Sequence, residues 1–249
     1  MDRRSRELAL ICEAEQIEVS ALAQRFDVSQ VTIRKDLAEL ERQGLIRREH
    51  GYAVAIAPDN LLSRLAMHFD AKRGIARAAA ALVSDHETVM IESGSCCALL
   101  AAELATRRGI TIITNSAFIA DYVRSGAAKV VLLGGDYQPE AQVTVGPLMA
   151  RCVEAYHVAR LFVGVDGYTP GLFCGKDMAR AEAVRAMAAR AGETVVLSVA
   201  AKFERQGAVA LLPATDVAVA VTEQTLLPNV AQQLAEAGVN VVLTGVGKD

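Results

Sequence analysis

The chain has 249 residues, a formal net charge of −3 and a hydrophobic fraction of 52%. This length accommodates a small domain and a medium one, and the hydrophobic fraction suffices for a sizeable core. The weakly acidic balance excludes a general polyanion binder, so any nucleic-acid surface has to be local. No apolar run reaches the roughly 18 residues of a membrane span, and we expect no signal peptide. Five cysteines without ligand spacing favour reduced thiols in a cytoplasmic protein and no metal site.

Residues 6–15, 20–26 and 30–43 carry apolar side chains at the spacing of amphipathic helices. The predicted apolar faces are Leu8, Ile11 and Cys12 in the first helix, Ala21, Leu22 and Phe26 in the second, and Ile33, Leu37 and Leu40 in the third. Ser29 is placed to cap the third helix, and Gly44 stands where a helix stop is expected. An alternating segment then predicts a short hairpin. This order is typical of a helix-turn-helix followed by a wing.

The side chains outside these apolar faces provide a candidate DNA surface. Gln30 lies in the first turn of the third helix, where a recognition helix meets base edges. Arginine and lysine suit guanine or phosphate, glutamine suits adenine, and arginines in the hairpin would reach flanking phosphates. The predicted DNA-binding residues are Ser29, Gln30, Thr32, Arg34, Lys35, Arg47, Arg48 and His50.

The charge of this segment does not by itself indicate DNA binding. Up to residue 57 there are nine basic and ten acidic side chains, so a basic footprint must come from their distribution over the surface. The alternative is a plain helical bundle with a solvated charged face, which would serve as an interaction module.

The segment resembles the winged helix-turn-helix signature of DeoR-type bacterial transcriptional regulators. The matching helix residues are Val28-Ser29, Thr32-Ile33-Arg34-Lys35-Asp36-Leu37, Leu40-Glu41 and Gly44. The matching wing residues are Leu45-Ile46, Arg48, His50-Gly51 and Ala53. Tyr52 stands where the family usually has a second glycine, so we expect a different wing tip. The resemblance implies a DNA-binding regulator.

Charge density falls in the following segment, and Pro58-Asp59-Asn60 favours a break. We therefore expect a DNA-binding domain at 1–57, a linker at 58–70 and an effector-sensing domain at 71–249. Predicted strands lie at 89–91, 111–114, 130–133, 160–165, 194–198, 217–221 and 239–243. Predicted helices lie at 70–84, 96–107, 116–125, 147–157, 177–191 and 226–237. This alternation predicts an α/β domain with a mainly parallel sheet.

Small polar residues follow five of the predicted strands, at the edge where open parallel sheets bind ligands. These residues are Ser93-Gly94-Ser95, Thr114-Asn115-Ser116, Gly134-Gly135-Asp136, Gly164-Val165-Asp166-Gly167 and Lys202. Any single loop is equally well explained as ordinary turn chemistry. Five such loops together favour a shared pocket for a polyol phosphate, bound by hydroxyls, backbone N–H groups and a lysine.

The second domain is similar to the DeoR-type effector domain, which is related in fold to ribose-5-phosphate isomerase and CoA transferases. The matching residues are Arg64 with Lys72, Ser93-Gly94-Ser95, Thr114-Asn115-Ser116, Gly134-Gly135, Gly146, Phe162, Gly164, Asp166-Gly167, Gly171-Leu172 and Lys202-Phe203. The resemblance implies a phosphorylated sugar or sugar derivative as effector. The predicted effector-binding residues are Lys72, Ser93, Gly94, Ser95, Cys96, Thr114, Asn115, Gly134, Gly135, Asp166, Gly167 and Lys202.

Four positions depart from the family pattern. Glu92 stands where the family commonly has Asp, Cys96-Cys97 where it has threonines, Val199-Ala200-Ala201 where it has Asp-Ser-Ser, and Ser63 where it has Glu. The lost hydroxyls and carboxylate change the hydrogen-bonding partners of the presumed pocket, so the effector is expected to differ. The two cysteines are either buried thiols or a redox-sensitive pair.

The pattern thus favours a repressor of a carbohydrate-metabolism operon, not an enzyme, without a cofactor. It would bind double-stranded operator DNA as a homodimer or homotetramer and be released by a phosphorylated sugar. The alternative is a sugar-phosphate isomerase or CoA-transferase-like enzyme, with Asp166 or Glu92 as base or nucleophile and Lys202 polarising a carbonyl. Such an enzyme has no need of residues 1–57.

Overall fold

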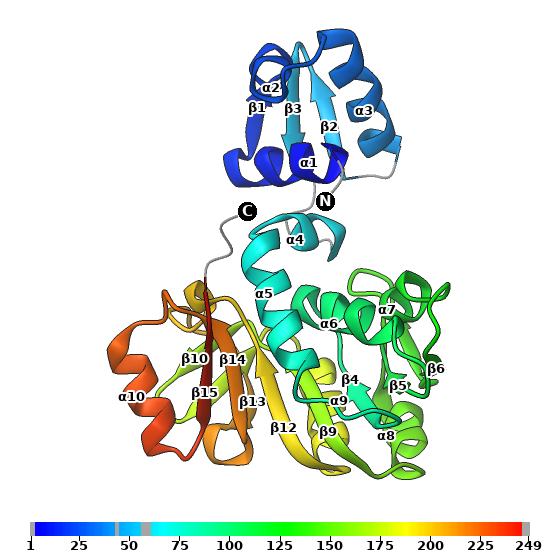
Figure 1. Ribbon diagram of the computed structural model, residues 1–249, viewed down its shortest axis with the longest axis vertical. Helices are drawn as coiled ribbons and strands as arrows, with labels where there is room; N and C mark the ends of the chain where they lie inside the picture. The colour runs from blue at the N-terminus through cyan, green and yellow to red at the C-terminus, as the bar shows by residue number, and fades with distance from the viewer. Residues whose placement is uncertain (1–2, 43–44, 56–60, 246–249) are drawn as a thin grey trace. The chain divides into compact units, whose positions relative to one another are not determined.

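The computed structural model describes residues 3–42, 45–55 and 61–245. The chain forms two compact units, Met1–Phe69 and Asp70–Asp249 (Figure 1). The expected stop at Gly44 and the expected break at Pro58-Asp59-Asn60 lie outside the described residues. Within the expected linker, residues 61–66 form a helix.

The first unit is a set of helices with a small antiparallel sheet. Its helices are α1 (Arg3–Ala14), α2 (Val19–Phe26), α3 (Gln30–Arg42) and α4 (Leu61–Ala66). Its strands are β1 (Gln16–Glu18), β2 (Ile46–Glu49) and β3 (Tyr52–Ala55), in the order β1-β3-β2. The predicted helices and hairpin are confirmed, whereas β1 was not expected because three residues are too few to show a period.

The core of the first unit forms as the helical spacing predicts. Ile33 and Leu37 are fully buried and Leu40 nearly so, together with Leu22. The prediction for Ala21 is wrong, because its side chain is exposed and Ala23 is buried in its place. The predicted cap of α3 is confirmed by a hydrogen bond of 3.1 Å from the backbone N–H of Thr32 to the Ser29 hydroxyl.

A buried carboxyl lies between α1 and α3. Glu7 is fully buried, and the Arg3 guanidinium reaches both Glu7 at 3.4 Å and Asp36 at 2.6 Å. Burial raises the pKa of Glu7 to about 7, and the neighbouring charge of Asp36 adds to the rise. The first unit therefore holds a proton at neutral pH that its unfolded chain releases.

The second unit is built on one seven-stranded parallel sheet with the order β15-β14-β12-β9-β4-β5-β6. Its strands are β4 (Thr88–Ile91), β5 (Thr111–Thr114), β6 (Lys129–Leu132), β9 (Val158–Gly164), β12 (Ala191–Leu197), β14 (Val219–Glu223) and β15 (Asn240–Thr244). The helices between them are α5 (Phe69–Ala80), α6 (Ser95–Ala105), α7 (Ala117–Tyr122), α8 (Gly146–Glu154), α9 (Met178–Ala188) and α10 (Pro228–Glu236). The predicted α/β fold is confirmed, strand by strand.

The strand order reverses direction between β4 and β9. From β4 the chain first adds β5 and β6 on one side, then crosses to the other side with β9, β12, β14 and β15 (Figure 1). At such a reversal the loops from neighbouring strands leave to opposite faces of the sheet, which opens a crevice at the carboxyl ends of the strands. The loops after β4 and β9 leave the sheet at this reversal.

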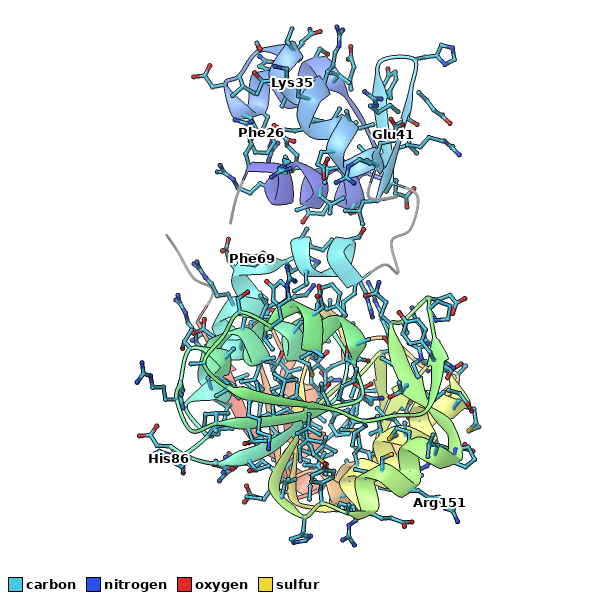
Figure 2. The ribbon with its side chains drawn as sticks, turned by 90° about the vertical axis from the view of Figure 1, so that its right-hand side faces the viewer. Phe26, Lys35, Glu41, Phe69, His86 and Arg151 are labelled. Carbon is cyan, nitrogen blue, oxygen red and sulfur yellow. The ribbon has the colours of Figure 1, made fainter. Side chains whose placement is uncertain are left out.

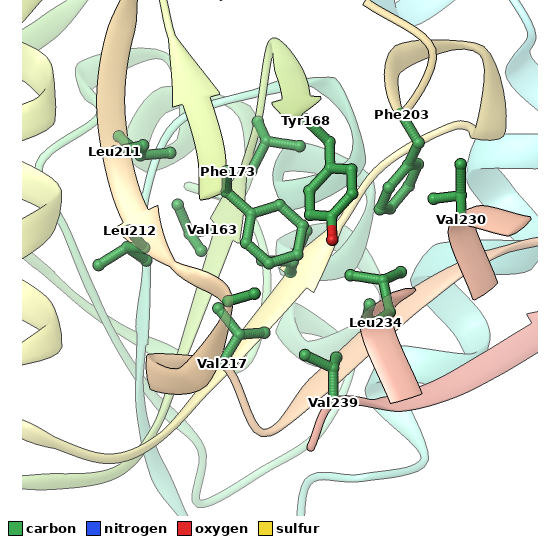
Figure 3. Close-up of a cluster of buried hydrophobic side chains, with 14 of the residues drawn as sticks. Val163, Tyr168, Phe173, Phe203, Leu211, Leu212, Val217, Val230, Leu234 and Val239 are labelled. Carbon is green, nitrogen blue, oxygen red and sulfur yellow. The ribbon is translucent and has the colours of Figure 1, made fainter. Parts of the chain in front are cut away.

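Short antiparallel strands extend the second unit and were not predicted. They are β7 (Asp136–Gln138) with β8 (Val143–Val145), and β10 (Gly167–Thr169) with β11 (Leu172–Gly175) and β13 (Val209–Pro213). The rings of Tyr168, Phe173 and Phe203 pack together, with centroids 5.2 to 6.2 Å apart (Figure 3). This aromatic group fixes the β10–β11 hairpin, which follows β9, against the core.

We expect Glu7→Gln to remove a pH-dependent loss of stability from the first unit. A carboxyl whose native pKa is raised contributes stability below about pH 4.5 that is lost as the pH rises through about 7. At pH 8 the variant should therefore melt about 4 °C or more above the native chain, the shift for roughly 1 kcal/mol in a small domain, with a much smaller gain at pH 5.

Scanning calorimetry of the full chain measures both values. The variant Leu37→Ala leaves a cavity in the core of the same unit and destabilises it. The melting transition that this variant shifts is therefore the one that belongs to the first unit. An equal difference between Glu7→Gln and the native chain at pH 5 and pH 8 would contradict the assignment.

Candidate functional site

The outward face of α3 carries the candidate DNA-reading side chains. Gln30, Val31, Arg34 and Lys35 are all exposed, and Thr32 is half-buried. Figure 2 shows Lys35 on α3 and Glu41, further along the same helix, beside the β2–β3 hairpin. Burial of the opposite side of α3 fixes this orientation, since one face of an amphipathic helix determines where the other points.

The predicted DNA residues in the first turn of α3 bond to one another. The Ser29 and Thr32 hydroxyls lie 2.9 Å apart, and the Arg34 guanidinium donates to the Gln30 amide oxygen at 3.4 Å. These long or exposed contacts are readily exchanged for contacts with a ligand. Lys35 has no hydrogen bond or ion pair with any residue in the described ranges.

The wing arginines are held by carboxylates. Arg47 pairs with Glu49 at 2.5 Å, and Arg48 pairs with Glu41 at 2.6 Å. The backbone N–H of Arg48 also donates to Glu41, and these bonds lower the pKa of the Glu41 carboxyl. The remaining predicted wing residue, His50, is exposed at the hairpin tip with a φ of 41°. The wing therefore offers less free positive charge than its sequence indicates.

The candidate effector site lies where β4 and β9 end side by side. Gly94, with a φ of 122°, begins the turn into α6, and a Cβ at Gly164 would lie 3.2 Å from the carbonyl oxygen of Ser93. The close approach of the two loops disfavours a side chain at Gly164, and the positive φ disfavours one at Gly94. Ser95 is the first residue of α6, so this turn presents backbone N–H groups at a helix N-terminus.

Glu92 is a buried carboxyl at the same strand end. The hydroxyl of Ser93 donates to Glu92 Oε1 at 2.6 Å. Burial raises the pKa of Glu92 to about 7, while the Ser93 hydrogen bonds and the Arg180 charge oppose the rise. The carboxyl is thus partly neutral at physiological pH, which lessens the negative charge at these strand ends.

Positive side chains converge on this point from several elements. The Lys202 ammonium donates to the carbonyl oxygen of Val165 at 2.7 Å and lies 3.4 Å from Asp166. Lys72, on α5, is 5% exposed. Its charge, like that of Lys202, lowers the pKa of the Cys96 thiol. The structure therefore brings the predicted residues Lys72, Cys96, Asp166 and Lys202 together with Ser93, Gly94 and Ser95.

A second group of predicted residues is tied into the structure around Thr144. The amide of Asn115 donates to the carbonyl oxygen of Thr144 at 3.0 Å, and Thr114 accepts from the backbone N–H of Ser116. The side-chain oxygen of Asn115 is buried without a hydrogen bond among the described residues. Because β5 pairs with β4, Thr114 and Asn115 follow the strand next to the Glu92 loop.

Two predicted glycines are explained by packing. A Cβ at Gly135 would lie 2.6 Å from the carbonyl oxygen of Val145, and one at Gly167 would lie 2.5 Å from that of Arg205. These two positions require glycine for close backbone approach whether or not a ligand is bound. Gly134, which follows β6 with Gly135, is not explained in this way, because a Cβ there would meet only the Cys152 sulfur at 3.8 Å.

Both cysteines of the vicinal pair are buried thiols. Cys97 is fully buried and Cys96 is 6% exposed. Burial raises the pKa of Cys96 and raises that of Cys97 well above the usual range. A thiol held protonated is a poor nucleophile, so the structural alternative is favoured over a redox-sensitive pair. The nearby Val199 and Ala200 are buried too, which makes this part of the site apolar.

Two charged residues at the site were not singled out in the sequence. The charge of Arg180, on α9, lowers the pKa of the Glu92 carboxyl. The Nε atom of Arg180 is buried without a hydrogen-bond partner in the described part of the chain. Glu223 accepts a hydrogen bond of 3.0 Å from the backbone N–H of Ala200. Its charge raises the pKa of the Cys96 thiol. Glu223 ends β14, so an extension of the strand-end pattern could have found it. Arg180 stands in an alanine-rich helix and gives no such signal.

None of the helices within residues 3–42, 45–55 and 61–245 is long and apolar enough to cross a membrane. Within the same ranges, no three His, Cys, Asp or Glu side chains gather as a metal site requires.

Comparison with solved structures gives a weak likeness to the fold of ribose 5-phosphate isomerase A from Methanocaldococcus jannaschii. The TM-score is 0.42 at 21% identity, over 55% of each chain.

Comparison with known sequences covers nearly the whole chain. Residues 3–59 match the DeoR-like helix-turn-helix domain, and residues 67–224 match the DeoR C-terminal sensor domain. The chain is 26% identical to the transcriptional repressor AccR of Agrobacterium fabrum over 94% of each protein. It is 30% identical to the regulator GolR of Listeria innocua over 68% of each.

These relatives are transcriptional regulators, so the alternative of an isomerase or CoA transferase is not favoured. A helix-turn-helix with an outward-facing third helix is joined here to a parallel-sheet unit whose strand ends gather polar and charged groups. The chain belongs to the DeoR family of DNA-binding transcriptional repressors with a C-terminal sensor domain.

Proposed function

We propose that this repressor controls an operon of carbohydrate metabolism and that a phosphorylated sugar, bound outside β4 and β9, modulates its hold on operator DNA. The observation that carries the proposal is the convergence of Lys72, Lys202 and Arg180 on the reversal point of the parallel sheet. Cations beside the N-terminus of α6 suit a phosphate group. The hydroxyl of Ser93 and the carboxylate of Asp166 suit the hydroxyls of a sugar.

On the DNA side, α3 would enter the major groove and the wing would lie along the phosphates. Gln30, Arg34 and Lys35 would meet base edges or nearby phosphates, with Ser29 and Thr32 holding the first turn of α3. Arg47, Arg48 and His50 would contact flanking phosphates. Because Glu49 and Glu41 hold the two arginines, DNA phosphates must compete with these carboxylates.

We further propose a homodimer or homotetramer in the cytoplasm. A two-fold symmetric operator requires two DNA-binding domains at a fixed spacing. A ligand that binds more tightly to a different arrangement of these domains shifts the population away from the arrangement that binds DNA. The proposed domain limits are 1–57 for the DNA reader, 58–70 for the linker and 71–249 for the sensor.

The proposal predicts binding that is specific, salt-dependent and released by one sugar phosphate. Fluorescence anisotropy would follow a duplex spanning the DNA upstream of the gene, with the full chain, at a series of salt concentrations. A thermal-shift screen of phosphorylated sugars identifies the ligand first, since binding to the native state raises the melting temperature. The identified sugar phosphate should then weaken DNA binding roughly 5- to 150-fold.

The matched variants separate DNA contact from general charge. Arg34→Ala with Lys35→Ala should lower the slope of log affinity against log salt by about 2, one unit for each lost phosphate contact. Arg124→Ala with Arg151→Ala removes the same charge from exposed positions of the second unit and should change neither affinity nor slope. Equal binding to any duplex, indifferent to every sugar phosphate, would contradict the proposal.

We also expect the binding of the sugar phosphate to strengthen as the pH falls from 8 to 6. The pKa of Glu92 is raised to about 7, so its carboxyl loses its negative charge over this interval and no longer repels the ligand. The expected gain in affinity is on the order of tenfold, the effect of one partly screened like charge. Calorimetric titration at the two pH values measures it.

Glu92→Gln is the matched variant for this titration. It should bind the sugar phosphate at pH 8 as tightly as the native chain does at pH 6, apart from the ionisation of the ligand itself, which affects both proteins alike. If the ratio of affinities at the two pH values is the same in both proteins, Glu92 does not face the ligand.

A further inference from the structure

The recognition helix exposes one apolar side chain. Val31 is 60% exposed, the highest value among the large hydrophobic residues of the described ranges. It lies in the first turn of α3, beside Gln30 and one turn before Lys35. Isolated exposed valines are common on protein surfaces, but this one lies within the predicted DNA surface.

Helix geometry places Val31 near the middle of the outward face. Val31, Lys35 and Ala38 are spaced i, i+4 and i+7 and form one stripe on the helix surface. The buried stripe of Ile33, Leu37 and Leu40 lies on the other side of the helix. A groove that receives α3 would therefore meet Val31 at the centre of the contact, with Arg34 to one side.

Nothing in the described part of the first unit explains a valine at this position. A β-branched residue is a weaker helix former than alanine, leucine or glutamate, so local stability does not favour it. The polar residues around it pair among themselves, Ser29 with Thr32 and Gln30 with Arg34. Val31 belongs to no hydrophobic cluster of the described residues, so its methyl groups stabilise no packing there.

We propose that Val31 reads a thymine of the operator by packing its methyl groups against the C5-methyl group of that base. In the major groove this methyl is the one apolar feature that distinguishes a base pair, and the first turn of a recognition helix reaches the base edges. The inference rests on DNA binding by α3 and adds the specificity of one position. It assigns the polar contacts on either side to Gln30 and Lys35.

The test replaces single thymines by uracil, which lacks only this methyl group. A duplex enriched by the full chain from a random-sequence pool serves as the probe, and each thymine is replaced in turn. One uracil in each half-site should weaken binding by the native chain about fourfold per half-site, the effect of removing one buried methyl group from each contact. Fluorescence anisotropy measures each affinity.

The variant Val31→Ala should bind the thymine duplex about as weakly as the native chain binds the uracil duplex, and should not distinguish the two. This non-additivity in the double cycle is what a direct contact predicts. Alanine favours the helix, so the variant keeps its fold, and circular dichroism checks this. Lys35→Ala is the matched control, since it should lose affinity for both duplexes equally and keep the fourfold ratio per half-site.

Two kinds of result would overturn the inference, and they are distinguishable from each other. If a duplex is enriched but no uracil changes its affinity, or if Val31→Ala keeps the fourfold ratio per half-site, α3 binds DNA without this contact. If no duplex is enriched over the random pool, specific DNA binding fails, and the inference fails with it.

Discussion

The close approach of two backbones at the reversal of the parallel sheet determines the shape of the sensor site. A Cβ at Gly94 would lie 3.9 Å from the Gly164 Cα atom, so the backbone segments that follow β4 and β9 lie close together. The groups assigned to the proposed site, from the N-terminus of α6 to Lys202, lie at these strand ends. The arrangement is rigid because it is set by the sheet, whereas the ligand groups are carried on the loops.

Charge is distributed unevenly over both units. In the first unit Arg47 and Arg48 are paired with Glu49 and Glu41, whereas Lys35 on α3 has no ion pair with any described residue. In the second unit burial raises the pKa of Glu92 to about 7, and Lys72, Lys202 and Arg180 carry positive charge near the ends of β4 and β9. A small net negative charge is therefore compatible with one surface for DNA and one for a phosphate, since local distribution decides both.

Much of this structure could be predicted from sequence because buried parallel strands and long amphipathic helices carry strong patterns. All seven parallel strands coincide with predicted segments, as does the buried face of α3. Apart from the β2–β3 hairpin, which was predicted, the antiparallel strands were missed because such short segments do not by themselves distinguish a strand from a loop. Arg180 was missed because only tertiary folding brings α9 to the end of β4. The pair of Glu41 and Arg48 was missed because the two residues lie on different elements.

Hydrogen exchange measured by mass spectrometry on the full chain, with and without the identified sugar phosphate, tests most directly whether the sensor binds its ligand at the reversal point. Binding there should slow exchange in residues 93–97 and 164–167, since their amides become ordered or bonded to the ligand. Protection confined to the shallow pocket beside Tyr122, or to the hairpin of β7 and β8, would contradict a site at the ends of β4 and β9.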